Sequence, residues 1–280
     1  MVFATPFAGV YGTATSSARH FPKHWHGTYG FGLLDDGAQT SASGRGTVDA
    51  YAGQVMTTNP GEVHDGRPLG GPSRRWRMLH LDPEILLDMV MPPGAARRTV
   101  ELARPVIDDV ALREAIVPLF ARLHQWSSPR GAFDTAIVLA CEEALANACG
   151  QLVARHSTLL GANAWPADVT RARDCLADRV ADPPPLSELA AMVGLSRFQL
   201  VRRFSSSFGM TPYAWLQHQR AERARRLIRS GLRLADAAAA SGFADQSHLT
   251  RSFTRHFGFT PGAWQQACNQ VQDRGAPASR

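Results

Sequence analysis

The sequence predicts an α+β protein, with an N-terminal β-barrel and its following helices in residues 1–165 and an all-α domain in residues 166–280. Three observations predict it. Residues 1–82 are rich in glycine and in short apolar runs, the apolar spacing changes to a helical period from Pro83 onward, and the last third contains an internal repeat. The repeat predicts two helix-turn-helix units, at about 186–208 and 234–257.

Short strands alternate with turn signals in the first 82 residues. The segments Phe31–Leu34, Gln54–Thr58 and Arg77–Leu81 are apolar and strand-length, and turns such as Asn59-Pro60-Gly61 separate them. Several short strands at regular spacing are typical of a sandwich or a barrel.

The helical pattern that follows is interrupted once before the C-terminal domain. Val106–Gln125 and Phe133–Arg155 have apolar residues at helical spacing, whereas Leu159–Pro166 contains Gly161, Asn163 and Pro166 and is expected to be a linker. We expect a frayed tail after about Asp273.

Charge is distributed unevenly between the two halves. Residues 1–165 hold 14 Lys and Arg against 15 Asp and Glu, whereas residues 166–280 hold 16 against 9, a net of +7. A localised basic surface is typical of nucleic-acid binding, although a solvated basic helical domain has the same charge. The four cysteines form no CxxC pair, and neither a signal peptide nor an uninterrupted apolar run of membrane-spanning length is evident. We therefore expect a cytoplasmic protein without a membrane partner.

The internal repeat is the strongest signal in the chain. Residues 200–215 read LVRRFSSSFGMTPYAW and residues 249–264 read LTRSFTRHFGFTPGAW. At an offset of 49 residues, the identical pairs include Leu200/Leu249, Arg202/Arg251, Phe204/Phe253, Phe208/Phe257, Gly209/Gly258, Thr211/Thr260, Pro212/Pro261 and Trp215/Trp264.

A short helix and a glycine turn precede each copy. The first helix of each unit is expected at Leu186–Val193 and Leu234–Ser241, and a turn beginning with Gly194 or Gly242 follows it. Ser196 and Asp245 are suitable N-caps for the second helix of each unit. Helix, short turn and helix is the helix-turn-helix arrangement.

The second helix of each unit has one apolar and one polar face. At about 100° per residue, Leu200, Phe204 and Phe208 share the core side of the first, and Leu249, Phe253 and Phe257 share that of the second. The opposite faces carry Arg, Gln, Ser and Thr, which can bond base edges and phosphates in a major groove. A merely solvated face is the alternative for either helix taken alone.

Residues 170–270 resemble the DNA-binding domain of the AraC/XylS family of transcription regulators. The resemblance rests on Gly194-Leu195-Ser196, on the repeat, and on Gly242-Phe243 through Pro261, with Arg220–Ile228 similar to the family's linker helix. It implies seven helices that set two recognition helices into successive major-groove segments of double-stranded DNA. It further implies that RNA polymerase is a partner and weakly favours activation. The base-reading positions carried over from the family are Phe198, Gln199, Arg202, Gln246, Ser247, Thr250 and Arg251.

The N-terminal half resembles the cupin barrel that many AraC-type regulators use as a sensor. His24-Trp25-His26, Gly53 and the run from Asn59 to His64 match its two motifs, but the glutamate that metal-binding cupins place after the HxH is missing. Three interpretations stay open: a pocket for a small-molecule effector, a three-histidine metal site, and histidines with only a structural role. We assign no cofactor and no metal. The candidate effector-binding residues are His24, His26, Tyr29, His64, Trp76 and Met78.

The chain could also be a homodimer. Phe133, Ile137, Ala140 and Ala144 form an apolar stripe that could pair two copies, and such a stripe can equally be part of the intrachain core.

The function that these patterns favour is transcription regulation controlled by a small-molecule effector, without enzymatic activity. A cupin-type metal-dependent enzyme with a DNA-binding appendage is the alternative, and the missing carboxylate argues against it. A DNA-repair methyl acceptor would need a zinc-bound cysteine cluster, whereas Cys141, Cys149, Cys175 and Cys268 are scattered.

Overall fold

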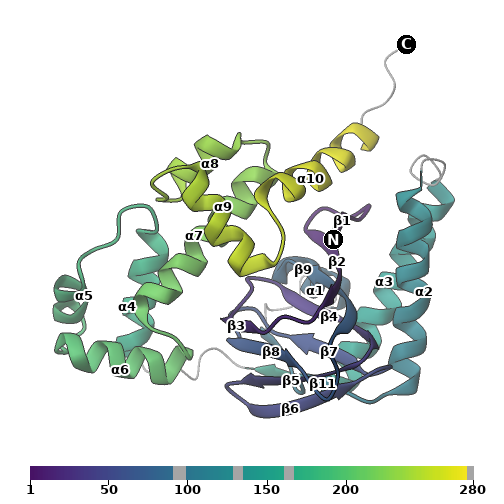
Figure 1. The fold of residues 1–280 in the computed structure, drawn as a ribbon, viewed down its shortest axis with the longest axis horizontal. Coiled ribbons are helices and arrows are strands. Elements are labelled where there is room, and N and C mark those ends of the chain that lie inside the picture. The colour runs from purple at the N-terminus through teal and green to yellow at the C-terminus, as the bar shows by residue number, and fades with distance from the viewer. Residues whose placement is uncertain (91–98, 129–134, 161–166, 276–280) are drawn as a thin grey trace. The chain divides into compact units, whose positions relative to one another are not determined.

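A computed structural model describes residues 1–90, 99–128, 135–160 and 167–275 (Figure 1). The chain forms two compact units, one of Met1–Ala162 together with Ala267–Arg280 and one of Asn163–Gln266. The predicted boundary between residues 165 and 166 lies outside the described residues.

Antiparallel strands make up most of the first unit. A six-stranded sheet has the order β1-β2-β9-β4-β7-β11, a four-stranded sheet has the order β3-β8-β5-β6, and β10 pairs with β12. The strands are β1 (Val2–Ala4), β2 (Val10–Ser17), β3 (Phe21–His24), β4 (Tyr29–Asp36), β5 (Ala38–Ser43), β6 (Gly46–Tyr51), β7 (Val55–Thr58), β8 (His64–Pro68), β9 (Arg74–Leu81), β10 (Thr99–Leu102), β11 (Val106–Ile107) and β12 (Ser157–Leu160).

The strand register gives the six-stranded sheet two buried faces. Tyr29, Phe31 and Leu33 of β4 share one face with Leu79 and Leu81 of β9, and all five belong to the core cluster that includes the helices. The other face carries Leu34, Met56 and Met78, which form a second cluster with Ala50 of the four-stranded sheet. The two sheets therefore face each other across a shared interior, in agreement with the predicted β-rich domain.

Three helices cover the outer face of the six-stranded sheet. They are α1 (Pro83–Val90), α2 (Val110–Ser127) and α3 (Thr135–His156), and α3 contacts both others. Leu112, Ile116 and Leu119 of α2 and Leu145 and Leu152 of α3 are fully buried in the cluster beneath them.

The structure corrects two expectations at helix ends. The predicted helix from Val106 is wrong at its start: Val106 and Ile107 pair with β7, and α2 begins after Asp109, whose carboxylate accepts from the N–H groups of Ala111 and Leu112. The predicted linker from Leu159 is also wrong at its start. Its first two residues belong to β12, which pairs with β10, and residues 161–166 lie outside the described part.

The apolar stripe on α3 packs within the chain. Ala144 belongs to the core cluster and Ile137 packs against it, whereas Phe133 lies outside the described residues. By length and composition Ala136–His156 could cross a membrane, but Leu145, Cys149 and Leu152 are fully buried against the rest of the unit. Packing within the unit thus accounts for these three apolar residues, while 28% of the apolar window of α3 is buried.

The second unit is helical, and α7 is its central helix. Its described helices are α4 (Ala167–Asp178), α5 (Leu186–Met192), α6 (Arg197–Phe208), α7 (Pro212–Arg229), α8 (Leu234–Ala240), α9 (Gln246–Phe257) and, up to Gln266, the first part of α10 (Pro261–Gly275). Helix α7 contacts α4 and α6 on the one hand and α8 and α9 on the other. The two predicted helix-turn-helix units are therefore α5–α6 and α8–α9, joined through one long helix.

Glycine is required at both turns between the paired helices. Gly194 and Gly242 have φ of 68° and 80°, in the left-handed region that other residues rarely adopt. A Cβ at Gly242 would also lie 2.8 Å from the carbonyl oxygen of Ala181, whereas a Cβ at Gly194 would meet nothing within 4 Å.

These geometries predict a graded effect of alanine substitution. Gly194→Ala should cost about 1–2 kcal/mol of unfolding free energy from backbone strain, and Gly242→Ala should cost more because the Ala181 backbone must also move. Gly262→Ala, in α10 with open space around it, should stay within about 0.5 kcal/mol of the wild type. Urea denaturation followed by circular dichroism measures the order, and equal losses for Gly194→Ala and Gly242→Ala would contradict it.

Candidate functional site

Side-chain caps fix the start of each recognition helix. The Ser196 side chain accepts from the N–H of Gln199, whose amide oxygen accepts in turn from the Ser196 N–H, and Asp245 accepts from the N–H of His248 at 2.6 Å. The predicted N-caps of α6 and α9 are thereby confirmed. Gly209 and Gly258, with φ of 72° and 78°, end the same two helices.

One face of each recognition helix is available to a partner. Leu200, Phe204, Leu249 and Phe253 are fully buried, as predicted, while Phe208 and Phe257 are only partly buried. The proposed base-reading residues lie on the other side: Phe198, Gln199, Arg202, Gln246, Ser247 and Arg251 are exposed and Thr250 is partly exposed. Phe198 is 75% exposed, which is unusual for so large an apolar side chain and suits contact with a thymine methyl group.

The arginines of these faces differ in what they already bind. Arg203 pairs with Asp168 at 2.6 Å, whereas Arg202 and Arg251 form no ion pair with any residue in the described ranges. Their guanidinium groups are therefore available to phosphates or guanine.

Two of the proposed base-reading side chains also serve the local backbone. The amide oxygen of Gln199 takes part in the capping box, and the Thr250 hydroxyl donates to the carbonyl of Gln246 at 2.9 Å.

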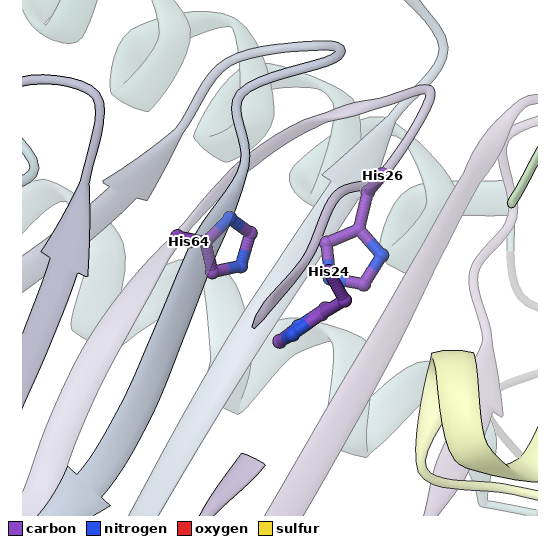
Figure 2. A group of neighbouring side chains, drawn as sticks. All are labelled: His24, His26 and His64. Carbon is purple, nitrogen blue, oxygen red and sulfur yellow. The ribbon is translucent and has the colours of Figure 1, made fainter. Parts of the chain in front are cut away.

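Three histidines meet inside the first unit (Figure 2). His24 at the end of β3, His26 after it and His64 at the start of β8 have ring centroids 4.5–5.4 Å apart, and one ring nitrogen of each lies within 4.8 Å of the others. The cross-strand register pairs His24 directly with His64. Segments 40 residues apart in sequence thus meet at one place, as predicted.

Backbone contacts set the orientation of two of the rings. Nδ1 of His24 donates to the carbonyl of Pro22 at 2.7 Å, and Nδ1 of His64 donates to that of Glu62 at 2.8 Å. Since a carbonyl can only accept, Nδ1 carries the proton and Nε2 is the acceptor in each neutral ring. Burial, followed by the nearby His64, lowers the pKa of His24 to about 3, so His24 is neutral at pH 7.

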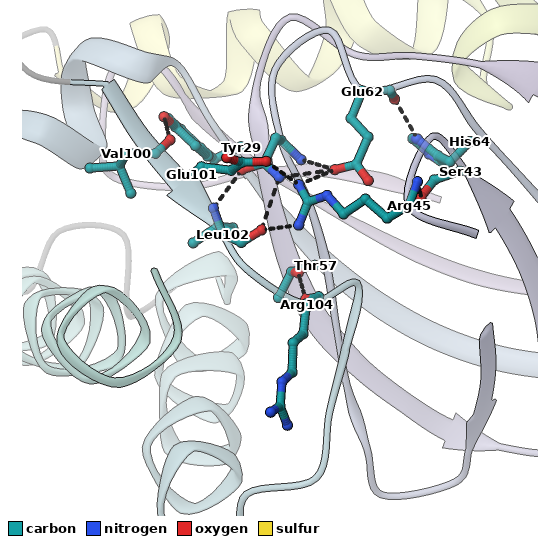
Figure 3. A network of polar contacts seen from close by, with 11 residues as sticks. Tyr29, Ser43, Arg45, Thr57, Glu62, His64, Val100, Glu101, Leu102 and Arg104 are labelled. Atoms are coloured by element: carbon teal, nitrogen blue, oxygen red, sulfur yellow. Dashed lines mark hydrogen bonds and ion pairs between the residues drawn. The ribbon is translucent and has the colours of Figure 1, made fainter. Parts of the chain in front are cut away.

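A polar network holds the segment that carries His64 (Figure 3). The Glu62 carboxylate accepts from Arg45 at 3.0 Å and from the Asn59 amide at 2.9 Å, and Asn59 bonds both the N–H and the carbonyl of Leu102 in β10. The network leaves the Glu62 carboxylate engaged with Arg45 and Asn59 instead of the imidazoles.

Among the described residues of this cluster, the metal-ligating atoms that lie within 4.8 Å of one another are the ring nitrogens of His24, His26 and His64. Three imidazole nitrogens, two of them on rings oriented by backbone carbonyls, suit a divalent metal such as Zn²⁺ with an open fourth position. The same nitrogens can bond the hydroxyl or carboxyl groups of an organic ligand.

Trp76 and Met78 lie on the same interior face. Together with His80 they occupy every second position of β9. The His80 ring stacks on the Tyr11 ring with 4.6 Å between centroids, and its centroid lies 5.5 Å from that of His26. The sequence reading missed His80 and Arg74, although the period of two along β9 places both with Trp76 and Met78.

The proposed role of Tyr29 is corrected by the register. Tyr29 pairs with Leu81 on the helix-facing side of the six-stranded sheet, and its hydroxyl donates to the carbonyl of Val100 at 2.5 Å. A residue that lies three positions after His26 in sequence points away from the interior because the strand alternates from Tyr29 onward.

In comparisons with known proteins, each of the two units matches a family model. Residues 7–137 match the model of the AraC-like ligand binding domain, and residues 189–267 match that of a helix-turn-helix domain. The chain is 26% identical over 232 residues to the uncharacterized HTH-type transcriptional regulator YbfI of Bacillus subtilis, covering 82% of this chain and 81% of the relative.

Two further similarities concern a short segment and the fold, respectively. The regulatory protein Ada of Salmonella typhimurium is 42% identical over 65 residues, which is 23% of this chain and 18% of Ada. The crystal structure of ToxT from Vibrio cholerae with bound unsaturated fatty acid has a TM-score of 0.54 and 11% identity, over 91% of this chain and 94% of ToxT. That likeness concerns the fold.

The second unit has two capped recognition helices with exposed polar faces, the first has a histidine-bearing interior, and each matches its own family model in the expected order. The chain belongs to the AraC/XylS family of transcription regulators.

Proposed function

We propose that the two recognition helices read successive segments of one operator and that a small molecule in the interior of the first unit controls this binding. The observation that carries the proposal is the pair of exposed helix faces, each with an arginine that no described residue neutralises. Two such faces on helices packed against the same α7 suit two consecutive major-groove segments.

Effector control follows from a change in populations. An effector that binds one arrangement of the protein more tightly shifts the chain toward it, by no more than the difference in binding free energy. We propose that this shift changes how two copies, acting as a homodimer, occupy neighbouring sites and contact RNA polymerase. In this account the chain acts in the cytoplasm and catalyses no reaction.

The first prediction concerns base reading by α9. Arg251→Ala should weaken binding to the operator by about 1–3 kcal/mol and relax the base preference at one position, because an arginine bonded to guanine carries sequence information. Arg179→Ala is the control, since Arg179 lies on neither recognition helix and pairs with Glu188. Selection of binding sequences from random DNA measures both variants. An equal loss on all sequences would make Arg251 a phosphate contact.

The second prediction concerns the operator itself. Fragments from around the chain's own coding region, titrated against random competitor DNA, should yield a complex whose affinity falls steeply with salt, as phosphate contacts release counterions. Binding no tighter than to random DNA, for both the full chain and residues 166–280, would contradict recognition of sites there.

A metal-dependent activity is the second candidate function, and the three converging imidazoles favour it. Purified protein would then hold close to one equivalent of a transition metal, and His24→Ala and His64→Ala would each lose it. Under the effector proposal the same two variants lose the response to the effector while the metal content of the wild type is negligible. Elemental analysis, paired with DNA binding in the presence and absence of effector, separates the two outcomes.

Homodimerisation is tested by sedimentation of the full chain. A monomer at tens of micromolar, with and without operator DNA, would rule out the dimeric form of the model. Because Ile137 and Ala144 serve the intrachain core, variants at these positions would not be informative.

A further inference from the structure

One buried cation in the first unit has only neutral partners. Arg74, at the start of β9, is 1% exposed, and its Nε donates to the amide oxygen of Gln39 at 2.8 Å. Its Nη1 donates to the carbonyls of Arg19 at 3.1 Å and Ser17 at 3.5 Å. The guanidinium also lies over the rings of Trp76, at 4.7 Å, and Phe21, at 5.7 Å.

Within the described part of the chain, the charge of Arg74 has no counterion. None of the described acidic residues forms an ion pair with it, and its Nη2 has no hydrogen bond to any residue in the same ranges. Burial lowers the pKa of the guanidinium, but an arginine stays charged in proteins. Buried charges are normally paired or bound to an ion, because desolvation of an unpaired charge is costly.

Because residue 66 is a glycine, no side chain from β8 covers Nη2 of Arg74. Gly66 is a buried position of β8, and a Cβ built there would lie 3.4 Å from Nη2 of Arg74 and 3.7 Å from both Oε1 of Gln39 and Oγ of Ser41. Polar atoms of two other strands thus converge on a point that a methyl group would occupy.

We propose that the space beside Nη2 of Arg74 is an anion subsite, in which the Arg74 guanidinium and the Ser41 hydroxyl hold the carboxylate of an organic-acid effector, while Gln39 orients both through its amide. A planar carboxylate suits a guanidinium that has one free terminal nitrogen, and the Ser41 hydroxyl can donate to it as well. The inference rests on the proposed function, because it names the chemical class of the effector.

The interior next to the subsite suits an apolar body. Along the same face of β9, Trp76 and Met78 follow Arg74, and Met78 packs with Leu34 and Met56. From Arg74 to His80 the strand runs six residues, roughly 20 Å at about 3.3 Å per residue. An acid with an aromatic or short aliphatic body could therefore lie along these side chains, with its carboxylate at Arg74.

The test compares acids with their uncharged counterparts. Benzoate, phenylacetate and decanoate, each beside its primary amide, are titrated into the full chain at constant ionic strength, and binding is followed by calorimetry and by the shift of the melting temperature. At least one acid should bind, with an affinity tenfold or more above that of its amide, as expected for a hydrogen bond to a charged group.

Three variants locate the binding. Arg74→Gln removes the charge, and Gly66→Ala fills the subsite at contact distances that a folded protein accommodates, so each should weaken the acid about tenfold or more. Arg75→Gln changes the next, exposed residue of the same strand and should leave the affinity unchanged. If Arg74→Gln does not fold, Gly66→Ala alone decides.

Three results would overturn the subsite: no acid of the panel binds, amides bind as well as acids, or Gly66→Ala binds the acid like the wild type. The proposed function is judged separately, by whether a bound compound changes operator affinity. An acid that requires Arg74 but leaves DNA binding unchanged would refute effector control and leave the subsite standing. A neutral compound that changes DNA binding, with no acid of the panel bound, would support effector control and refute the subsite.

Discussion

The first unit depends on one constraint, the burial of both faces of its six-stranded sheet. Because side chains alternate along a strand, every second residue of β4 and β9 must serve the helical layer and the others must serve the interior. Most helix-facing residues are large and apolar, as in Phe31, Leu79 and Leu81, and Arg77 on the same face pairs with Asp35. The interior face is mixed: Met78 packs in the second core cluster, whereas Gly30 and His80 add a small and a polar position beside it.

In the second unit the corresponding constraint is the shared helix α7. Both helix-turn-helix units pack against it, and a buried ion pair within it, Arg225 to Glu222 at 2.9 Å, lies beneath Trp264, whose indole N–H donates to the Arg225 carbonyl. A buried pair of this kind contributes more to specificity of packing than to stability in some proteins. Here the indole hydrogen bond links α7, which joins the two helix-turn-helix units, to α10, which follows the second of them.

The sequence predicted best what depends on local chemistry and on repetition. The caps Ser196 and Asp245, the turn glycines and the buried Leu200 and Phe204 are all as expected, because each follows from neighbours within about four residues. The strands of the first unit were also found in outline. The start of α2 was misplaced because the pairing of Val106 with Met56 is a long-range contact that helical periodicity does not reveal.

The interior residues show the same limit more sharply. His24, His26 and His64 are recognisable from their motif, whereas Tyr29, also among the candidate effector-binding residues, lies on the helix-facing side of the sheet. The alternation along β9 could have identified His80 and Arg74 from Trp76 and Met78. No local pattern could have identified Gly66, since its significance comes from Gln39, Ser41 and Arg74, which only the assembled strands bring around it.

A buried guanidinium without a counterion also bears on how the protein could switch. A ligand shifts an equilibrium only by the difference between its affinities for the two states, so the group whose energy changes most on binding has the greatest influence. Among the interior side chains that the structure describes, neutral His24 and apolar Met78 change little in charge balance when a ligand arrives. Arg74 gains the anion that its surroundings lack, and the desolvation cost of its charge is then offset. Binding at that end of the interior would consequently be the step most able to favour one arrangement of the first unit over another.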